Sequence, residues 1–291
     1  MNISSRHVVK VIPALLRHVS LCGLLTAGVA ALTAAPAVAQ GKLDARYEAS
    51  LAGIEVGKGA WVIQVDDDFY SASATGTTSG VMQAFSSGNG RGEAQGRVIN
   101  GQFVPGNYKA SITGGKKTET IRLTLANGNV KESSIEPEPP QDDDRIPVTD
   151  AHRRGVIDPM TASFLRVPGT GDVLTPDSCR VSTPIFDGRM RYDLRMEYKR
   201  TETVKAEKGY RGPALVCAVY FNPVSGYIPD RAAIKYLIKQ RDMEVWLAPI
   251  VGTRVLAPFK LKIPTPLGNA MLEATQFITQ ATPPKSASRT Q

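Results

Sequence analysis

The sequence predicts a mainly β protein: a soluble antiparallel β-barrel or curved half-barrel (spiral) with one or two short helices. Three observations predict this fold. Polar and apolar residues alternate with a period of two along several segments, glycine-containing turn pairs separate these segments, and helix signals are few. An open sheet of this length would expose unpaired edges, so we expect the sheet to close, or nearly close, on itself.

Residues 1–39 have the features of a cleavable signal peptide and are excluded from the fold. Three basic residues precede an apolar run at residues 21–34, which is shorter than the roughly 20 residues that span a bilayer. Small residues then predict cleavage between Ala39 and Gln40. We therefore expect an exported, periplasmic protein whose mature chain has no stable membrane span.

Cleavage would remove three of the 35 Lys and Arg residues and none of the 27 Asp and Glu residues, so the net charge would fall from +8 to +5. Basic residues are interleaved with acidic ones along the chain, so we expect no nucleic-acid partner. A modest positive charge is compatible with an anionic partner such as an envelope lipid or polymer.

The first half of the mature chain reads as consecutive strands. Residues 43–51 alternate between apolar and charged or polar side chains, and residues 121–125 repeat the pattern. Hairpin turns are predicted at Asn100-Gly101, Gly114-Gly115 and Asn127-Gly128. A Pro- and acid-rich loop at residues 133–147 then divides one domain, expected at residues 40–277, into two halves.

The second half contains both predicted helices. Asp158 is a plausible N-cap before Pro159, and residues 230–240 carry helix formers after an aspartate. Residues 189–199 alternate without an error, which predicts a strand with one face in a core and one in water. Shorter alternations follow at residues 215–221 and 259–263, and the polar tail at 278–291 is expected to be disordered.

Two cysteines remain after cleavage, Cys179 and Cys217, with 37 residues between them. An even pair in an oxidising compartment predicts a disulfide, which would stabilise the fold by roughly 3–4 kcal/mol through loop closure.

His152 is the one histidine left after cleavage. No nucleophile-elbow motif accompanies it, so we predict a polar loop and assign no catalytic residue. We retain one binding hypothesis, in which His152, Arg153, Arg154 and Asp158 lie around a helix start and hold an anionic head group.

Metal and cofactor sites are not predicted. A single histidine and a bonded cysteine pair cannot build a zinc site, and the acidic runs at 66–68 and 142–144 lack the spacing of a calcium loop. The glycine-rich run at 88–96 lacks the spacing of a dinucleotide-binding loop.

Several ordered blocks resemble the exported bacterial family called domain of unknown function 3108. They are YEASLAGIEVGKGAW, AHRRGVIDPMTASFLR, CRVSTPIFDGRMRYDL and the segment from RDMEVWLAP to KIPTPLG. The Asp158-Pro159 pair and the Asp187-Gly188-Arg189 turn match features of that family. The resemblance implies a periplasmic, β-rich protein similar to curved half-barrels that carry lipids or lipoproteins, and it implies no activity.

We expect a non-enzymatic binding protein that supports the cell envelope. Its partner would be a lipid or other envelope component, held as an acyl chain in the concave face, or an envelope protein. The alternative is a hydrolase that acts on an envelope polymer through His152 or a carboxylate pair.

Overall fold

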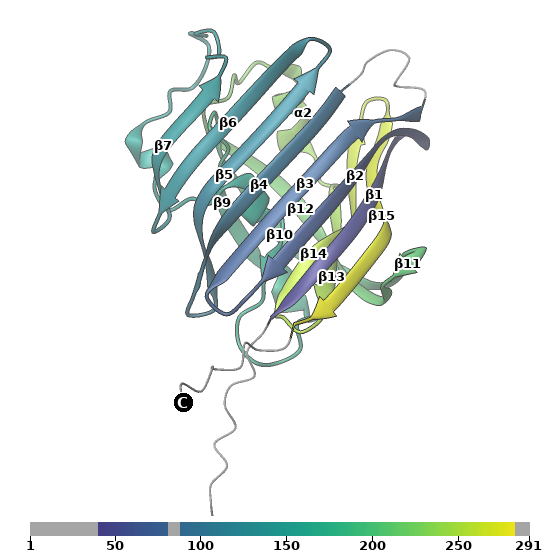
Figure 1. Cartoon of the computed structure of the whole chain (residues 1–291). Helices are drawn as coiled ribbons and strands as arrows, with labels where there is room; N and C mark the ends of the chain where they lie inside the picture. Colours follow the sequence, from purple (N-terminus) through teal and green to yellow (C-terminus); the bar gives the residue numbers. More distant parts are fainter. Residues whose placement is uncertain (1–39, 81–87, 283–291) are drawn as a thin grey trace, which may run out of the picture. The chain divides into compact units, whose positions relative to one another are not determined.

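The computed structural model describes residues 40–80 and 88–282, and these form one curved, predominantly antiparallel sheet (Figure 1). The strands of the first half are β1 (Gly41–Leu51), β2 (Ile54–Val65), β3 (Phe69–Thr78), β4 (Gly88–Ile99), β5 (Gln102–Gly114), β6 (Lys117–Ala126) and β7 (Asn129–Glu136). Those of the second half are β8 (Leu165–Arg166), β9 (Val181–Phe186), β10 (Arg191–Lys205), β11 (Lys208–Gly209), β12 (Arg211–Ser225), β13 (Glu244–Ile250), β14 (Val255–Thr265) and β15 (Gly268–Ala281).

The helices are short. They are the 3-10 turns η2 (Asp150–Arg153) and η3 (Pro176–Cys179) and the α-helices α1 (Pro159–Ala162) and α2 (Ala232–Lys239). Both predicted α-helices are therefore confirmed, although Arg231 and not Asp230 is the N-cap of α2. None of the helices in the described residues is long and apolar enough to cross a membrane.

The sheet is open, which favours the half-barrel over the closed barrel. Its strand order is β7-β6-β5-β4-β3-β2-β1-β15-β14-β13-β12-β10-β9, with β8 and β11 attached to β14 and β15. The first and last strands of the chain, β1 and β15, pair in the middle of this order. Consequently β7 and β9, which are joined by residues 137–180, lie at opposite ends of the sheet.

The two ends of the sheet are bridged by that connecting segment. Arg154 forms a β-bridge with Asn129 of β7, and Ile157 forms one with Ile185 of β9. A small cluster of buried residues spans the same place: Leu123 and Leu125 of β6, Val156, and Phe186 of β9. We call residues 150–158, with this cluster, the seam. The two ends of the open sheet are therefore joined by packed side chains and a few backbone hydrogen bonds, and not by a continuous strand ladder.

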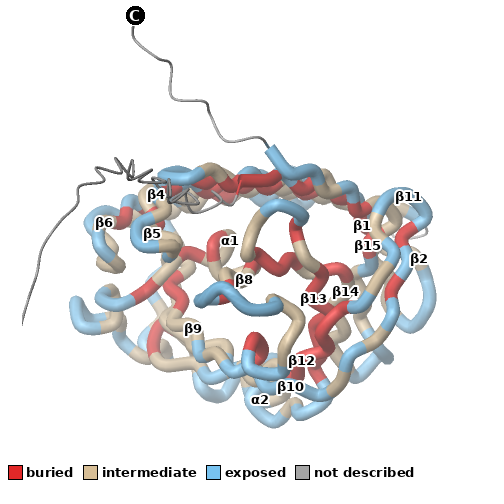
Figure 2. The backbone as a smooth tube through the Cα atoms, turned by 90° about the horizontal axis from the view of Figure 1, so that it is seen from below, coloured by how far each residue is buried: buried red, intermediate tan, exposed pale blue. Residues whose placement is uncertain are grey.

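Most of the interior is a packed core. The largest cluster joins side chains of β1–β3 to side chains of β12–β15 through Phe164, which follows α1. Figure 2 shows α1 and β8 inside the curve of the sheet, with buried segments around them. Aromatic rings fill the middle, including Phe259 and Phe277, whose centroids are 5.5 Å apart. A fully buried side chain of this size contributes about 1.5–3 kcal/mol.

Three details differ from the expectations. No residue of β10 before Val204 is fully buried, and Tyr198 is 37% exposed, because β10 lies near one end of the open sheet. Residues 278–281, expected in a disordered tail, belong to β15 because their backbone pairs with the start of β1. The acid-rich loop begins at Pro137, since residues 133–136 complete β7. Residues 283–291 and Ala39 lie outside the described residues.

Candidate functional site

His152 caps a local turn. Its Nδ1 accepts a hydrogen bond from the backbone N–H of Thr149 at 3.1 Å, and the side chain is half-buried. Within the described part of the chain, its hydrogen bonds go to Thr149 and to neither Asp150 nor Asp158. The geometry of a catalytic triad, in which a carboxylate orients the histidine beside a serine, is therefore not formed by these side chains.

The two arginines of the seam have different surroundings. The guanidinium of Arg153 lies 5.7 Å from the centroid of the Phe186 ring and donates to Ser133 Oγ. Arg154 is exposed, and its backbone pairs with Asn129. Of the four residues expected to hold a head group, only Arg153 lines a cavity large enough for a small molecule among those described below.

Asp158 is a buried helix cap. Its Oδ1 accepts from the N–H of Thr161 at 2.8 Å and its Oδ2 from the Thr161 hydroxyl at 2.6 Å. That hydroxyl also meets the hydroxyl of Tyr70 at 2.8 Å, so α1 is tied to β3. Burial raises the pKa of the Asp158 carboxyl, and the hydrogen bonds from Thr161 oppose this shift. The Asp-Pro motif thus positions α1 inside the curve of the sheet.

The predicted disulfide between Cys179 and Cys217 is present. Both residues are fully buried, in a cluster that lies between η3 and strands β12–β14. The bridge attaches the end of the segment that includes β8 and η3 to a central strand of the second half. Among the described residues, no group of three or more His, Cys, Asp and Glu side chains is placed to hold a metal ion.

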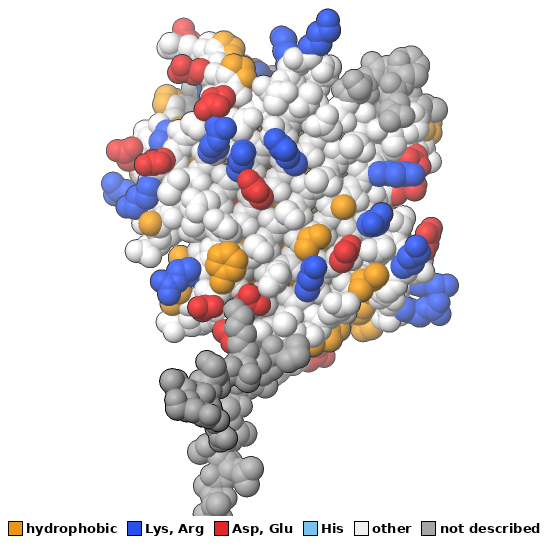
Figure 3. All heavy atoms as spheres, in the orientation of Figure 1, with side chains coloured by type: hydrophobic (Ala, Val, Ile, Leu, Met, Phe, Trp, Pro, Cys, Tyr) orange, Lys and Arg blue, Asp and Glu red, His pale blue; other side chains and the backbone are white. Residues whose placement is uncertain are grey.

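A shallow groove of about 510 Å³ crosses the outer face of the first half of the sheet. Its side chains form a row at paired positions of neighbouring strands: Gln64, Ser71, Gln95, Asn107 and Thr124. Figure 3 shows charged side chains of both signs spread over this face among small polar side chains and backbone, and the groove is also lined by Lys42, Glu93, Lys109 and Arg122. Because charged and polar side chains line much of the groove, it is a less suitable site for an apolar ligand than a pocket with apolar walls.

An apolar pocket of about 300 Å³ lies on the opposite, core-bearing face of β1–β3, and we call it the glycine pocket. Its floor contains Gly57, Gly59 and Gly76, at positions that alternate with outward-facing residues. Its walls are apolar: Tyr47, Ala49, Trp61, Ala74 and Leu272. The pocket continues the core cluster towards the end of the sheet where β1 turns into β2.

Gly76 has space above it, whereas Gly59 lies close to one backbone carbonyl. A Cβ added at Gly76 would meet only the carbonyl oxygen of Lys58, at 3.8 Å, and one at Gly59 only that of Thr75, at 3.0 Å. No side chain packs over either position within 4 Å. Within residues 40–80 and 88–282, this part of the core-bearing face is therefore left without a covering side chain.

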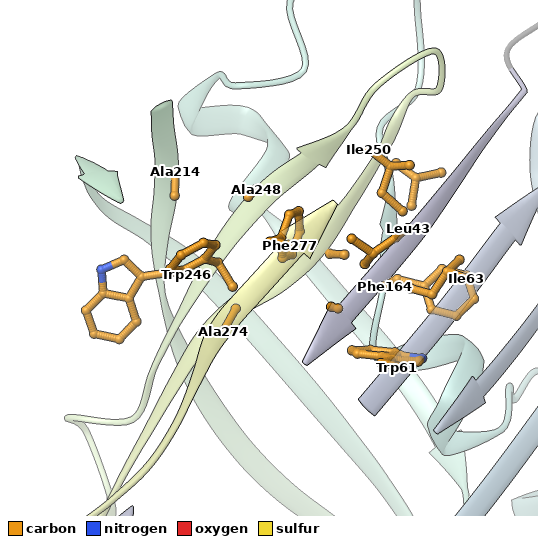
Figure 4. Close-up of a cluster of buried hydrophobic side chains, with 14 of the residues drawn as sticks. Leu43, Trp61, Ile63, Phe164, Ala214, Trp246, Ala248, Ile250, Ala274 and Phe277 are labelled. Carbon is orange, nitrogen blue, oxygen red and sulfur yellow. The ribbon is translucent and has the colours of Figure 1, made fainter. Parts of the chain in front are cut away.

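Trp61 separates the pocket from the packed core. The centroid of its ring lies 6.3 Å from that of Phe164, in an edge-on arrangement (Figure 4). It lies 6.4 Å from the centroid of the Tyr47 ring. The hydroxyl of Tyr47 donates to the carbonyl of Pro258 at 2.6 Å. In contrast, the indole N–H of Trp61 is buried and has no partner among the described residues, an arrangement that costs about 1–3 kcal/mol.

The glycine pocket was not predicted from the sequence, although a signal was present. In IEVGKGAW, Gly57, Gly59 and Trp61 share one face of a strand, and Gly76 continues the alternation of the next strand. Small residues at positions where core side chains are expected indicate an unfilled region. The structure was needed to show that no element of the described residues fills it.

Among known proteins, the chain has a matching family and a structural neighbour of low similarity. A family model described as "Protein of unknown function (DUF3108)" matches residues 46–275. A comparison with curated proteins gives no significant match. Among solved structures, the chain is similar to a beta-barrel-like protein of domain of unknown function DUF1849 from Brucella abortus, at 7% identity and a TM-score of 0.47, over 84% of this chain and 98% of that one.

Proposed function

The chain belongs to the DUF3108 family, whose description assigns no activity, and we propose that it binds a small hydrophobic or amphiphilic ligand in the glycine pocket without transforming it. The observation that carries the proposal is the apolar pocket beside Trp61, whose glycine floor no side chain of the described residues covers. An apolar pocket left open in an otherwise packed core is a typical small-molecule site.

The size of the pocket limits the ligand. About 300 Å³ lies at the lower end of the range found for ligand sites. A whole long acyl chain would not fit, since Phe164 and the aromatic core fill the rest of the interior. We therefore propose a short apolar group, or the end of an acyl chain. Each buried methylene contributes about 0.8 kcal/mol, so roughly six would contribute about 5 kcal/mol before the cost of association.

The proposed setting is the periplasm, with the ligand drawn from the cell envelope. The signal-like segment at residues 1–39 and the disulfide between Cys179 and Cys217 support export to an oxidising compartment. A protein partner remains the alternative form of binding. The hydrolase hypothesis has no favourable observation, because His152 caps a turn and Asp158 caps α1.

The test uses the fluorescence of Trp61 during titration with n-octanol, with the second tryptophan, Trp246, as a constant background. We expect a saturable change for the natural protein. Gly76→Leu should fill the pocket and weaken octanol binding about ten-fold or more. It should keep or raise the melting temperature, because the added side chain enters open space and the backbone there is not in the left-handed region.

Gly114→Leu is the matched control, because Gly114 also has open space around its Cβ position but lies outside the glycine pocket. It should bind octanol as the natural protein does. If octanol produces no saturable change, or if Gly76→Leu binds it as tightly as the control, the proposed site is wrong.

A further inference from the structure

A second cavity, separate from the glycine pocket, gathers three arginines at the seam. It has a volume of about 330 Å³ and lies between the end of β7, the loop that follows, and the turn after β9. Arg145, Arg153 and Arg189 line it, and we call it the arginine pocket. Apolar residues complete much of its wall: Ile135, Pro139, Pro140, Ile146, Val148 and Phe186.

Each guanidinium is held in place by a different contact. Arg145 donates to the carbonyl of Gly226, and backbone hydrogen bonds join its neighbour Ile146 to Gly226 and Tyr227. Gly226 in turn packs directly on the backbone of Arg189, where a Cβ would overlap the carbonyl oxygen. Arg153 is positioned over Phe186. The three side chains therefore line one cavity on a largely fixed framework.

The residues that line this cavity carry more positive than negative charge, with three arginines and one acid, Asp142. Arg189 pairs with Glu119, but no carboxylate of the described residues lies within 4 Å of the guanidinium of Arg145 or Arg153. The one acidic residue in the wall, Asp142, already accepts a hydrogen bond from the backbone of Asp144.

Donor groups are also in excess. A guanidinium has five N–H donors. Arg145, Arg153 and Arg189 each make one side-chain hydrogen bond within the described residues. The remaining N–H donors of arginines that line one cavity are suited to the oxygens of a carboxylate or a phosphate.

We infer that the arginine pocket binds a small anion that carries an apolar group, such as an organic phosphate or carboxylate. The arginines would donate hydrogen bonds to the anionic oxygens. Phe186, Ile135 and the prolines would pack against the apolar part of the ligand. The volume suits one ring or a short chain. Because the pocket joins the two ends of the sheet, the bound anion would also stabilise the seam.

The test is calorimetric titration of the purified protein with phenyl phosphate, inorganic phosphate and phenol. We expect phenyl phosphate to bind more tightly than either of its parts. Arg153→Gln should weaken phenyl phosphate binding about ten-fold or more, since a charge-assisted contact is lost. Arg145→Gln should do the same, and it carries the test if Arg153→Gln does not fold.

Arg154→Gln is the matched control, because it removes the same charge from the next residue, which is exposed and outside the pocket. It should change binding less than two-fold or so. Vesicles with phosphatidic acid distinguish a lipid head group from a free anion: binding that depends on Arg153 identifies the former, and phenyl phosphate binding alone the latter. No binding of either, or equal losses in Arg153→Gln and Arg154→Gln, would overturn the inference.

Discussion

At the scale of single residues, Glu244 of β13 shows how a buried carboxylate is compensated. Only 4% of the residue is exposed, and its oxygens pair with Lys199 at 2.6 Å, Arg200 at 3.1 Å and Lys262 at 3.3 Å. Burial by itself raises the pKa of Glu244. The hydrogen bonds from the three cations outweigh burial and lower that pKa to about 2.

Glu244 should therefore contribute stability that depends on pH. Because its folded pKa is depressed from the ordinary 4.5 to about 2, the contribution is complete above about pH 4.5 and is lost as the pH falls towards 2. Glu244→Gln should destabilise the protein by about 1–3 kcal/mol at neutral pH, less than for a fully buried pair because the cations reach water.

The measurement compares urea unfolding of the two proteins at about pH 6 and about pH 3. The difference in the free energy of unfolding should shrink at the lower pH. A difference that stays constant across this range would show that Glu244 does not titrate as described. Glu273, a half-exposed acid paired with Lys260, provides a control substitution with a small effect.

At the scale of elements, α1 is too short to be stable by itself and depends on its cap. Four residues form barely one turn, and isolated helices of this length do not persist in water. The hydrogen bonds among Asp158, Thr161 and Tyr70 fix its position. Phe164 then enters the core directly after it.

Asp158→Ala should lower the free energy of unfolding by about 1–3 kcal/mol. The helix would lose its N-cap, and the buried N–H and hydroxyl of Thr161 would lose their carboxylate acceptor. Asp158→Asn should cost less, because an amide oxygen can still accept from the Thr161 N–H. Thermal unfolding followed by circular dichroism distinguishes the two. A loss of octanol or phenyl phosphate binding without a change in stability would instead assign Asp158 a role in binding.

The pH dependence of Asp158 has the opposite sign to that of Glu244. Its folded pKa is raised, so its unfavourable contribution appears as the pH rises through that pKa, and protonation favours folding at this site. The two carboxylates are thus distinguished by their partners: cations surround Glu244, whereas neutral donors surround Asp158.

At the scale of the whole molecule, we expect the seam to determine whether the two halves of the open sheet unfold together. The ends of the sheet meet through Leu123, Phe186 and Val156 and not through a continuous strand ladder. Removing a buried leucine costs about 2–5 kcal/mol. Leu123→Ala should have an effect of this size, and Ile112→Ala, which changes a residue that is 58% exposed on the adjacent strand, should have little effect.

The corresponding measurement is denaturant unfolding followed by both tryptophan fluorescence and circular dichroism. Coincident transitions for the natural protein and for Leu123→Ala would show that the seam stabilises a single cooperative unit. If Leu123→Ala separates the two transitions, the two halves of the sheet unfold independently once the seam is weakened.

Much of the fold followed from local patterns in the sequence. Alternation located β1, β6, β10, β12 and β14, and the turn pairs at Asn100, Gly114 and Asn127 began hairpins with backbone in the left-handed region. These features are local because strand alternation and turn conformation depend on neighbouring residues. The Asp158 cap was predictable because helix capping is also local in the sequence. The disulfide was predictable because an exported chain with two cysteines is expected to pair them.

The sites followed only from the tertiary structure. Arg145 and Arg189 are 44 positions apart in the sequence, and they meet because the connection between β7 and β9 folds back across the open end of the sheet. The glycine pocket depends on where the packed core of the described residues ends, at Trp61 and the Phe164 ring beside it. Local sequence thus determined the strands, whereas long-range packing decided which cavities remain and which charges surround them, since those depend on residues brought together from distant parts of the chain.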